Sequence, residues 1–137
     1  MHTYIHKVYY YETDKMGITH HSNYVRWMEE ARMDFLQASG CGMRGIEACG
    51  LTSPVVELEC RYLAPTTFDD VISIAVSVEG YTGVKLTLSY VMTNSATGAE
   101  VFRGRSSHCF INGAGRPVAI GKHHPALDAL LRGQAGQ

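Results

Sequence analysis

The spacing of apolar side chains along the chain changes near residue 22. Before this point, residues 5–11 are rich in aromatic and β-branched side chains, which favours a strand. Beyond it, apolar residues recur at steps of three and four and would form one face of a helix: Tyr24, Trp27, Met28, Ala31, Phe35 and Leu36. Ser22 or Asn23 is a suitable N-cap, and Gly40 fits the position just beyond the last turn. The pattern predicts a helix of roughly 16 residues that is a principal packing element.

After Pro54 the sequence predicts four strands separated by turn-forming residues, at residues 55–63, 71–78, 84–92 and 100–112. Apolar and polar residues alternate along 71–78 and 84–92. Residues 41–53 contain three glycines and no clean period, so we interpret them as a connection with one short helical turn. Pro125 indicates a final short helix over residues 124–132.

This order of elements predicts an α+β domain in which one long helix covers one face of an antiparallel sheet. A length of 137 residues fits a single domain over residues 1–137. The second face of the sheet and its edges would remain open. Burial against another copy of the chain is the simplest way to cover them, so we expect a homodimer or homotetramer.

Composition and charge exclude several classes of function. The chain is 45% hydrophobic and 18% charged, which is typical of a soluble globular protein, and its net charge of -1 does not favour nucleic-acid binding. No apolar run approaches the roughly 20 residues needed to span a bilayer. The first residues lack the pattern of a signal peptide, so we expect a cytoplasmic location without membrane insertion. The four cysteines have no C-x-x-C spacing, which favours free thiols over a metal or redox site.

The densest group of reactive side chains lies between residues 10 and 27. Asp14 precedes a glycine turn and lies close to the expected start of the long helix. A helix N-terminus offers unpaired N–H groups and partial positive charge, which suit an oxyanion on a carbonyl substrate. A nearby carboxylate could attack that carbonyl or activate a water molecule. From the residues alone, a role of Asp14 as a cap of the turn or of the helix is favoured over a catalytic one, because Asp is a common cap and turn residue.

Other side chains give weaker signals. His20 and His21 are adjacent but lack the spacing of a metal site, and no G-x-S-x-G motif accompanies Ser22. Arg103 and Arg105 are two residues apart and share one face of the last strand, whereas Arg61 lies on another strand. Such cations could bind a phosphorylated ligand, or they could form an ordinary solvated surface.

Residues 10–32 form a specific motif. It reads Tyr10-x-Glu12-Thr13-Asp14-x-x-Gly17-Ile18-x-x-His21-x-Asn23-Tyr24-x-Arg26-Trp27-x-Glu29-x-Ala31-Arg32. This motif resembles the signature of the 4-hydroxybenzoyl-CoA thioesterase family of hotdog-fold acyl-CoA thioesterases, and within it the small enzymes of the Tol–Pal-associated type. Residues 59–70 also resemble the family's second strand and the following turn. The resemblance covers nearly the whole chain and weakens after about Asn112.

The resemblance implies a hotdog fold, in which the sheet wraps around the long helix. Asp14 would be the catalytic nucleophile or general base, and the backbone N–H at His21 would hold the thioester oxygen. Gly17 would let the substrate approach the loop, and Tyr10 would lie on a strand wall near the acyl group. Asn23 and Tyr24 belong to the same motif and are expected to contribute to substrate binding.

The resemblance also places the site at a dimer interface and makes an acyl-CoA the substrate. The coenzyme is then part of the substrate, and no separate cofactor or metal is expected. Three basic residues are candidates for contacts with the CoA phosphates: Arg61, Arg103 and Arg105.

The motif departs from the family in one place. Some members have Asp-Pro-Ala-Gly where this chain has Asp14-Lys15-Met16-Gly17, which leaves the acyl specificity open. Hydratases of the same fold carry a histidine five residues after their aspartate, whereas here the spacings are six and seven. The leading hypothesis is hydrolysis of a small or medium acyl-CoA, or of an acyl carrier protein thioester. The alternatives are a non-catalytic acyl-CoA or acyl-carrier binding module and an enoyl-CoA hydratase.

Overall fold

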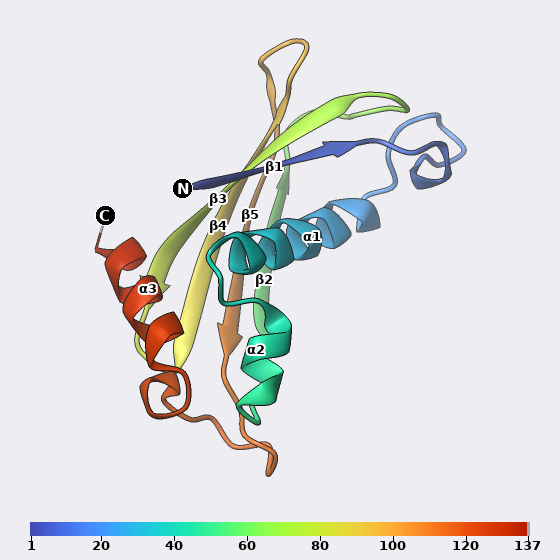
Figure 1. Cartoon of the computed structure of the whole chain (residues 1–137). Coiled ribbons are helices and arrows are strands. Elements are labelled where there is room, and N and C mark those ends of the chain that lie inside the picture. Colours follow the sequence, from blue (N-terminus) through green and yellow to red (C-terminus); the bar gives the residue numbers. More distant parts are fainter. Residues whose placement is uncertain (137) are drawn as a thin grey trace.

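A five-stranded antiparallel sheet curves around one long helix in the computed structural model, which describes residues 1–136 (Figure 1). The strands lie in the order β1-β3-β4-β5-β2. Their bounds are β1 (His2–Lys7), β2 (Val55–Tyr62), β3 (Val71–Tyr81), β4 (Lys85–Asn94) and β5 (Glu100–Cys109). The helices are α1 (Ser22–Ala38), α2 (Met43–Ala48) and α3 (Pro125–Ala135), with short 3-10 turns at Tyr10–Glu12 and Ile120–Lys122.

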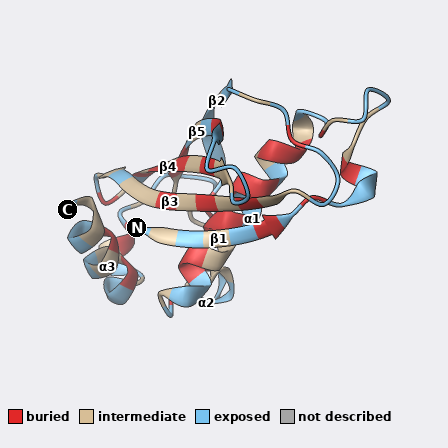
Figure 2. Cartoon of the chain, turned by 90° about the horizontal axis from the view of Figure 1, so that it is seen from above, coloured by how far each residue is buried: buried red, intermediate tan, exposed pale blue. Residues whose placement is uncertain are grey.

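The core lies between α1 and the concave face of the sheet. All six residues predicted for the apolar face of the long helix are buried. They meet the alternate apolar residues of the central strands: Ile72, Ile74 and Val76 of β3, and Leu86, Leu88, Tyr90 and Met92 of β4. Figure 2 shows buried segments of α1 and the middle strands that alternate with intermediate and exposed ones.

Gly104 on β5 allows α1 to lie close to the sheet. A Cβ atom at this position would lie 2.7 Å from Cε1 of Phe102 and 3.0 Å from Cε of Met28. Met28 belongs to α1, so the absent side chain of Gly104 makes room for the helix. The short distance to Met28 also shows that position 104 faces α1. Because side chains alternate along a strand, residues 103 and 105 point to the opposite face of the sheet.

Several element boundaries differ from the sequence predictions. The first strand ends at Lys7, and Tyr10–Glu12 form a 3-10 turn, because the Glu12 side chain accepts a hydrogen bond from the Tyr9 N–H. The strand predicted to end at residue 78 continues to Tyr81 across a bulge between Val78 and Gly80. The last strand ends at Cys109, since Ile111 forms isolated bridges with Thr52 and Pro117 instead.

The N-cap of α1 was predicted wrongly by one or two residues, whereas the residue beyond its last turn was predicted correctly. The N-cap is His21, with no side-chain capping bond, and neither Ser22 nor Asn23 occupies that position. Gly40 follows the C-cap residue Ser39 with φ of +85°, the left-handed conformation expected just beyond a helix.

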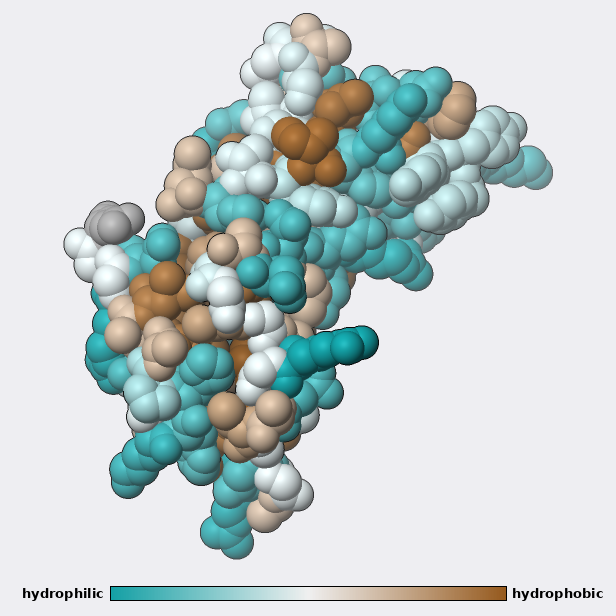
Figure 3. Space-filling model, in the orientation of Figure 1, coloured by the Kyte–Doolittle hydropathy of each residue, from teal (hydrophilic) through white to brown (hydrophobic). Residues whose placement is uncertain are grey.

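Strand β2 forms an open edge of the sheet. Val55, Val56, Leu58 and Tyr62 are between 44% and 53% exposed. Elsewhere, on the face shown in Figure 3, the surface is mostly polar and apolar residues gather in small separate patches. No helix among residues 1–136 has the length and apolar character needed to cross a membrane.

Candidate active site

Asp14 lies in a tight loop that begins and ends at a bridge between Thr13 and Thr19. Its N–H donates to the Ile18 carbonyl at 2.8 Å, and its carbonyl accepts from the Gly17 N–H at 3.0 Å. Gly17 has φ of +82°, a left-handed conformation in which a side chain would be strained. The loop therefore holds Asp14 in a defined place beside the start of α1.

The two carboxylate oxygens of Asp14 differ. Oδ1 accepts a hydrogen bond from the Met16 N–H at 2.8 Å, so it caps the turn as one interpretation of the sequence suggested. Oδ2 accepts no hydrogen bond from residues 1–136. Asp14 lines an open polar cavity of about 540 Å³ together with His20, Ser22, Asn23 and Arg26. One carboxylate oxygen is thus available to a ligand in this cavity.

The helix start offers a free backbone donor. The Ser22 N–H donates to Nδ1 of His20 at 3.2 Å, and the Asn23 N–H donates to the His20 carbonyl at 3.0 Å. The N–H of His21 donates to no group within residues 1–136, while the His21 carbonyl accepts from the Tyr62 hydroxyl at 2.9 Å. This N–H lies at the positive end of the α1 dipole, which makes it suited to a carbonyl oxygen that gains negative charge.

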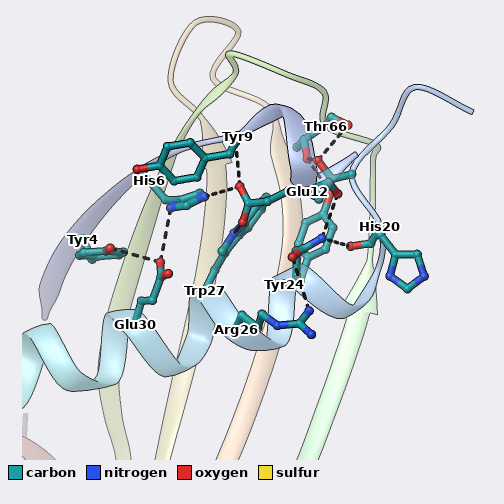
Figure 4. A network of polar contacts seen from close by, with 12 residues as sticks. Tyr4, His6, Tyr9, Glu12, His20, Tyr24, Arg26, Trp27, Glu30 and Thr66 are labelled. Atoms are coloured by element: carbon teal, nitrogen blue, oxygen red, sulfur yellow. Dashed lines mark hydrogen bonds and ion pairs between the residues drawn. The ribbon is translucent and has the colours of Figure 1, made fainter. Parts of the chain in front are cut away.

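A hydroxyl cluster joins the helix start to the segment after β2 (Figure 4). The Thr19 N–H donates to the Thr66 carbonyl at 2.8 Å, and their hydroxyl oxygens are 2.6 Å apart. The Tyr24 hydroxyl lies 2.8 Å from Oγ1 of Thr66. Burial raises the pKa of Tyr24, so its hydroxyl stays neutral. These contacts form one wall of a second cavity.

The second cavity is mostly apolar and has a volume of about 340 Å³. It is lined by residues of the loop, the helix start and the end of β2: Ile18, Thr19, His21, Tyr24, Tyr62, Leu63, Ala64 and Pro65. A polar cavity with a free carboxylate oxygen and an apolar cavity therefore flank the first turn of α1.

A sequence profile of the thioesterase-like superfamily matches residues 8–131. The chain belongs to this superfamily. The match confirms the resemblance that residues 10–32 indicated, and with it the prediction of a thioester-hydrolysing enzyme.

Three known proteins are similar to this chain in sequence or in structure. YneP of Bacillus subtilis, provisionally named an acyl-CoA thioesterase, is 32% identical over 120 residues, which cover 87% of this chain and 86% of YneP. YbgC of Escherichia coli, named an acyl-CoA thioester hydrolase, is 27% identical over 65% of this chain and 66% of its own. A DHNA-CoA thioesterase from Staphylococcus aureus superposes with a TM-score of 0.89 at 25% identity, covering 98% of this chain and 94% of that enzyme. This likeness confirms the predicted α+β hotdog fold.

Most of the residues expected from the motif gather at the two cavities. Asp14 and Asn23 line the polar cavity, and His21 and Tyr24 line the apolar one. The His21 ring is exposed and stacks on His20, and the backbone N–H of His21 has no acceptor within residues 1–136. The Gly17 carbonyl accepts a hydrogen bond from the Thr67 hydroxyl at 2.7 Å, which fixes the loop from its outer side.

Tyr10 does not lie on a strand wall. It belongs to the 3-10 turn, is 76% exposed, and makes an edge-to-face contact with Phe68. The strand predicted for it ends at Lys7 because the chain turns toward the Glu12 side chain. A contact of Tyr10 with the acyl group stays a prediction.

The three candidate arginines are not brought together with Asp14 within one chain. Arg61 and Arg103 are directly opposite each other on β2 and β5, and Arg103 and Arg105 flank Gly104. Because Gly104 faces the helix, these arginines lie on the outer face of the sheet. Arg103 pairs with Glu100 at 2.7 Å, and Arg105 pairs with Glu79. Their contact with CoA phosphates stays a prediction.

Glu12 is the residue that sequence reasoning overlooked. It is only 4% exposed, and its carboxylate lies among His6, Tyr9 and Trp27 (Figure 4). A charged residue two positions before Asp14, inside an aromatic run and within the motif, was the available signal. No group of three or more His, Cys, Asp or Glu side chains in residues 1–136 could hold a metal ion.

Glu12 leads to a specific prediction for stability in acid. Burial alone would raise the pKa of Glu12, but hydrogen bonds from the Tyr9 N–H, His6 and Trp27 outweigh it and hold the pKa below its ordinary value of 4.5. Such a carboxyl stabilises the folded state above its unfolded pKa, and this contribution is lost as the pH falls through the folded pKa. The difference in free energy of unfolding between wild type and Glu12→Gln should therefore shrink as the pH falls from about 6 toward 3. Urea denaturation measures it, and a difference that stays constant with pH contradicts the prediction.

Proposed function

We propose that this protein hydrolyses the thioester of an acyl-CoA with a small or medium acyl group, with Asp14 as nucleophile or general base. The proposal is carried by two groups near the start of α1: a carboxylate oxygen of Asp14 free of hydrogen bonds within residues 1–136, and the free backbone N–H of His21. Binding alone gains nothing from this carboxylate, since CoA is itself strongly anionic. A site for acyl transfer needs both groups.

In the proposed reaction, the thioester oxygen accepts a hydrogen bond from the His21 N–H. This donor and the helix dipole stabilise the negative charge that develops on the oxygen when the carbonyl carbon is attacked. The attacking group is Oδ2 of Asp14 or a water molecule that Asp14 deprotonates. The carbon–sulfur bond then breaks and the CoA thiolate leaves. Water supplies the new oxygen of the carboxylic acid and the proton of the free thiol, in one step or after an acyl-enzyme anhydride.

The apolar cavity of about 340 Å³ is suited to the acyl group, because its walls are aliphatic and aromatic side chains around the helix start. The names of YneP, YbgC and the Staphylococcus aureus enzyme all refer to CoA thioesters. This supports acyl-CoA over an acyl carrier protein as the physiological donor.

Thiol release from a panel of acyl-CoAs and acyl carrier protein thioesters tests the proposal. We expect turnover with at least one acyl-CoA and weaker turnover with the carrier protein. Tight binding of acyl-CoA without thiol release would favour a binding module. Loss of enoyl absorbance without thiol release would favour a hydratase.

We further propose that the functional unit contains a homodimer formed along the β2 edge. This strand has eight residues, and no other strand of residues 1–136 pairs with its outer side. Its apolar residues Val55, Val56 and Leu58 are exposed, which is the pattern of a strand that is covered by a partner. Tyr62 ends β2 and lines the apolar cavity, so a partner strand along β2 would lie next to that cavity.

Leu58→Lys should disrupt this dimer, because it places a charge on the exposed apolar edge. Sedimentation should give twice the chain mass of 15.1 kDa for wild type and a lower mass for the variant. Ala96→Lys, in the exposed turn between β4 and β5, is the matched control and should stay dimeric. A monomeric wild type that is fully active would contradict the proposal.

A further inference from the structure

The Glu12 carboxylate is an anchor shared by three parts of the fold. Oε1 accepts hydrogen bonds from the Tyr9 N–H and from Nε2 of His6, each at 2.8 Å. Oε2 accepts from Nε1–H of Trp27 at 2.7 Å. These donors belong to β1, to the turn after it and to α1, and Figure 4 shows the carboxylate between His6, Tyr9 and Trp27.

The backbone of Glu12 makes a second set of contacts. Its carbonyl accepts from Nδ2 of Asn23 at 2.9 Å and from the His20 N–H at 2.8 Å. Nδ2 of Asn23 also donates to the His20 carbonyl at 3.3 Å. Residue 12 is thus bound to the residue before His21 and to the first turn of α1.

Both reacting groups of the proposed site lie next to this anchor. Asp14 follows Glu12 by two residues, and the His21 N–H follows His20 directly. A shift of the anchor would therefore change the position of the carboxylate relative to the backbone donor. Misplacement by about 1 Å can cost on the order of a hundredfold in rate.

We propose that Glu12 is a positioning residue. By binding Tyr9, His6 and Trp27, it keeps the Asp14 carboxylate and the His21 N–H in fixed positions relative to each other. This inference rests on the proposed thioester hydrolysis and concerns the same site. In this proposal Glu12 acts through its hydrogen-bond partners and not on the substrate.

Glutamine has nearly the same shape as glutamate, but it places an NH2 donor where the carboxylate has its second acceptor oxygen. All three neighbours are donors, whereas an amide has one acceptor oxygen and one NH2 donor. Whichever way the amide is turned, its NH2 faces at least one N–H group, and that group must move. Glu12→Gln therefore displaces the turn or Trp27 while keeping side-chain volume.

The test is to measure kcat and KM of Glu12→Gln with the best acyl-CoA, at a temperature where the variant is folded. We expect kcat to fall by about tenfold or more with KM nearly unchanged. Asp128→Asn is the matched control, because it removes the carboxylate that accepts from the Tyr81 hydroxyl at 2.5 Å, on α3. This control should lower the thermal midpoint and leave kcat as in wild type.

A Glu12→Gln variant that loses stability but keeps wild-type kcat would overturn the positioning role. If Glu12→Gln does not fold, Trp27→Phe takes its place, because it removes one donor to Glu12 without adding a clash. Trp27→Phe should lower kcat severalfold at constant KM, and an unchanged kcat would also overturn the positioning role. Asp14→Asn separates this failure from a failure of the proposed function. If wild type releases thiol and Asp14→Asn does not, the proposed thioester hydrolysis is supported whatever the result for Glu12→Gln. If wild type releases no thiol, both the proposed hydrolysis and the positioning role of Glu12 are overturned.

Discussion

Asp14→Asn is expected to lower kcat for acyl-CoA hydrolysis by about a hundredfold or more, because it removes the nucleophile or general base. The amide oxygen can still accept the hydrogen bond from the Met16 N–H, so the loop should keep its shape. KM and the thermal midpoint should therefore stay close to those of wild type. Steady-state thiol release and thermal unfolding measure these quantities.

Asp69→Asn is the matched control for this substitution. Asp69 lies in another exposed loop, has φ of +71°, and pairs with Lys7 at 3.3 Å. Asparagine tolerates this left-handed conformation, so only a surface ion pair is lost. The control should keep wild-type kcat. Turnover of Asp14→Asn within a few-fold of wild type would show that Asp14 is not catalytic.

Trp27→Ala is expected to remove most of the stability of the fold. Trp27 is fully buried, and its ring centre lies 4.7 Å from those of both His6 and Tyr24. Truncation of a buried tryptophan costs about 3–5 kcal/mol of free energy of unfolding, against a total of roughly 5–15 kcal/mol for a domain. Urea denaturation measures this loss.

Trp27→Phe separates packing from hydrogen bonding at the same position. It keeps most of the ring but leaves Oε2 of Glu12 without its donor. An unsatisfied buried acceptor costs about 1–3 kcal/mol, so the loss should be clearly smaller than that of Trp27→Ala. If the two variants lose equal stability, the hydrogen bond to Glu12 and not the ring volume determines the role of Trp27.

The sequence was sufficient for the features that depend on local periodicity. The steps of three and four from Tyr24 to Leu36 predicted the buried face of α1, and the strand and turn patterns after Pro54 predicted all four later strands. Pro125 predicted the start of α3, which begins at that residue. These patterns record which side of an element is buried, and burial is what stabilises the element.

Features that depend on distant contacts were not predicted. The end of β1 depends on the Glu12 side chain, whose partners His6 and Trp27 lie 6 and 15 residues away. Two-residue spacing placed Arg103 and Arg105 on one face, but only the contact of Gly104 with Met28 shows which face. The N-cap at His21 has no side-chain capping bond, so the preference of Ser and Asn for that position did not locate it.

The candidate site was chosen through the motif and not through chemistry alone, and its catalytic role stays a prediction. The residues alone favoured a cap over a catalyst at Asp14. In the structure the two carboxylate oxygens of Asp14 differ. Oδ1 caps the turn, whereas Oδ2 is free of hydrogen bonds within residues 1–136. Spacing could not indicate this division, because it depends on the path of the loop back to Thr19.

The most direct test of thioester hydrolysis at Asp14 is a product balance in isotopically labelled water. Wild type should convert an acyl-CoA into equal amounts of free CoA thiol and a carboxylic acid that carries oxygen from the water. Asp14→Asn should give neither above background. Recovery of intact acyl-CoA, or addition of labelled water to the acyl chain with the thioester unbroken, would contradict the proposed function.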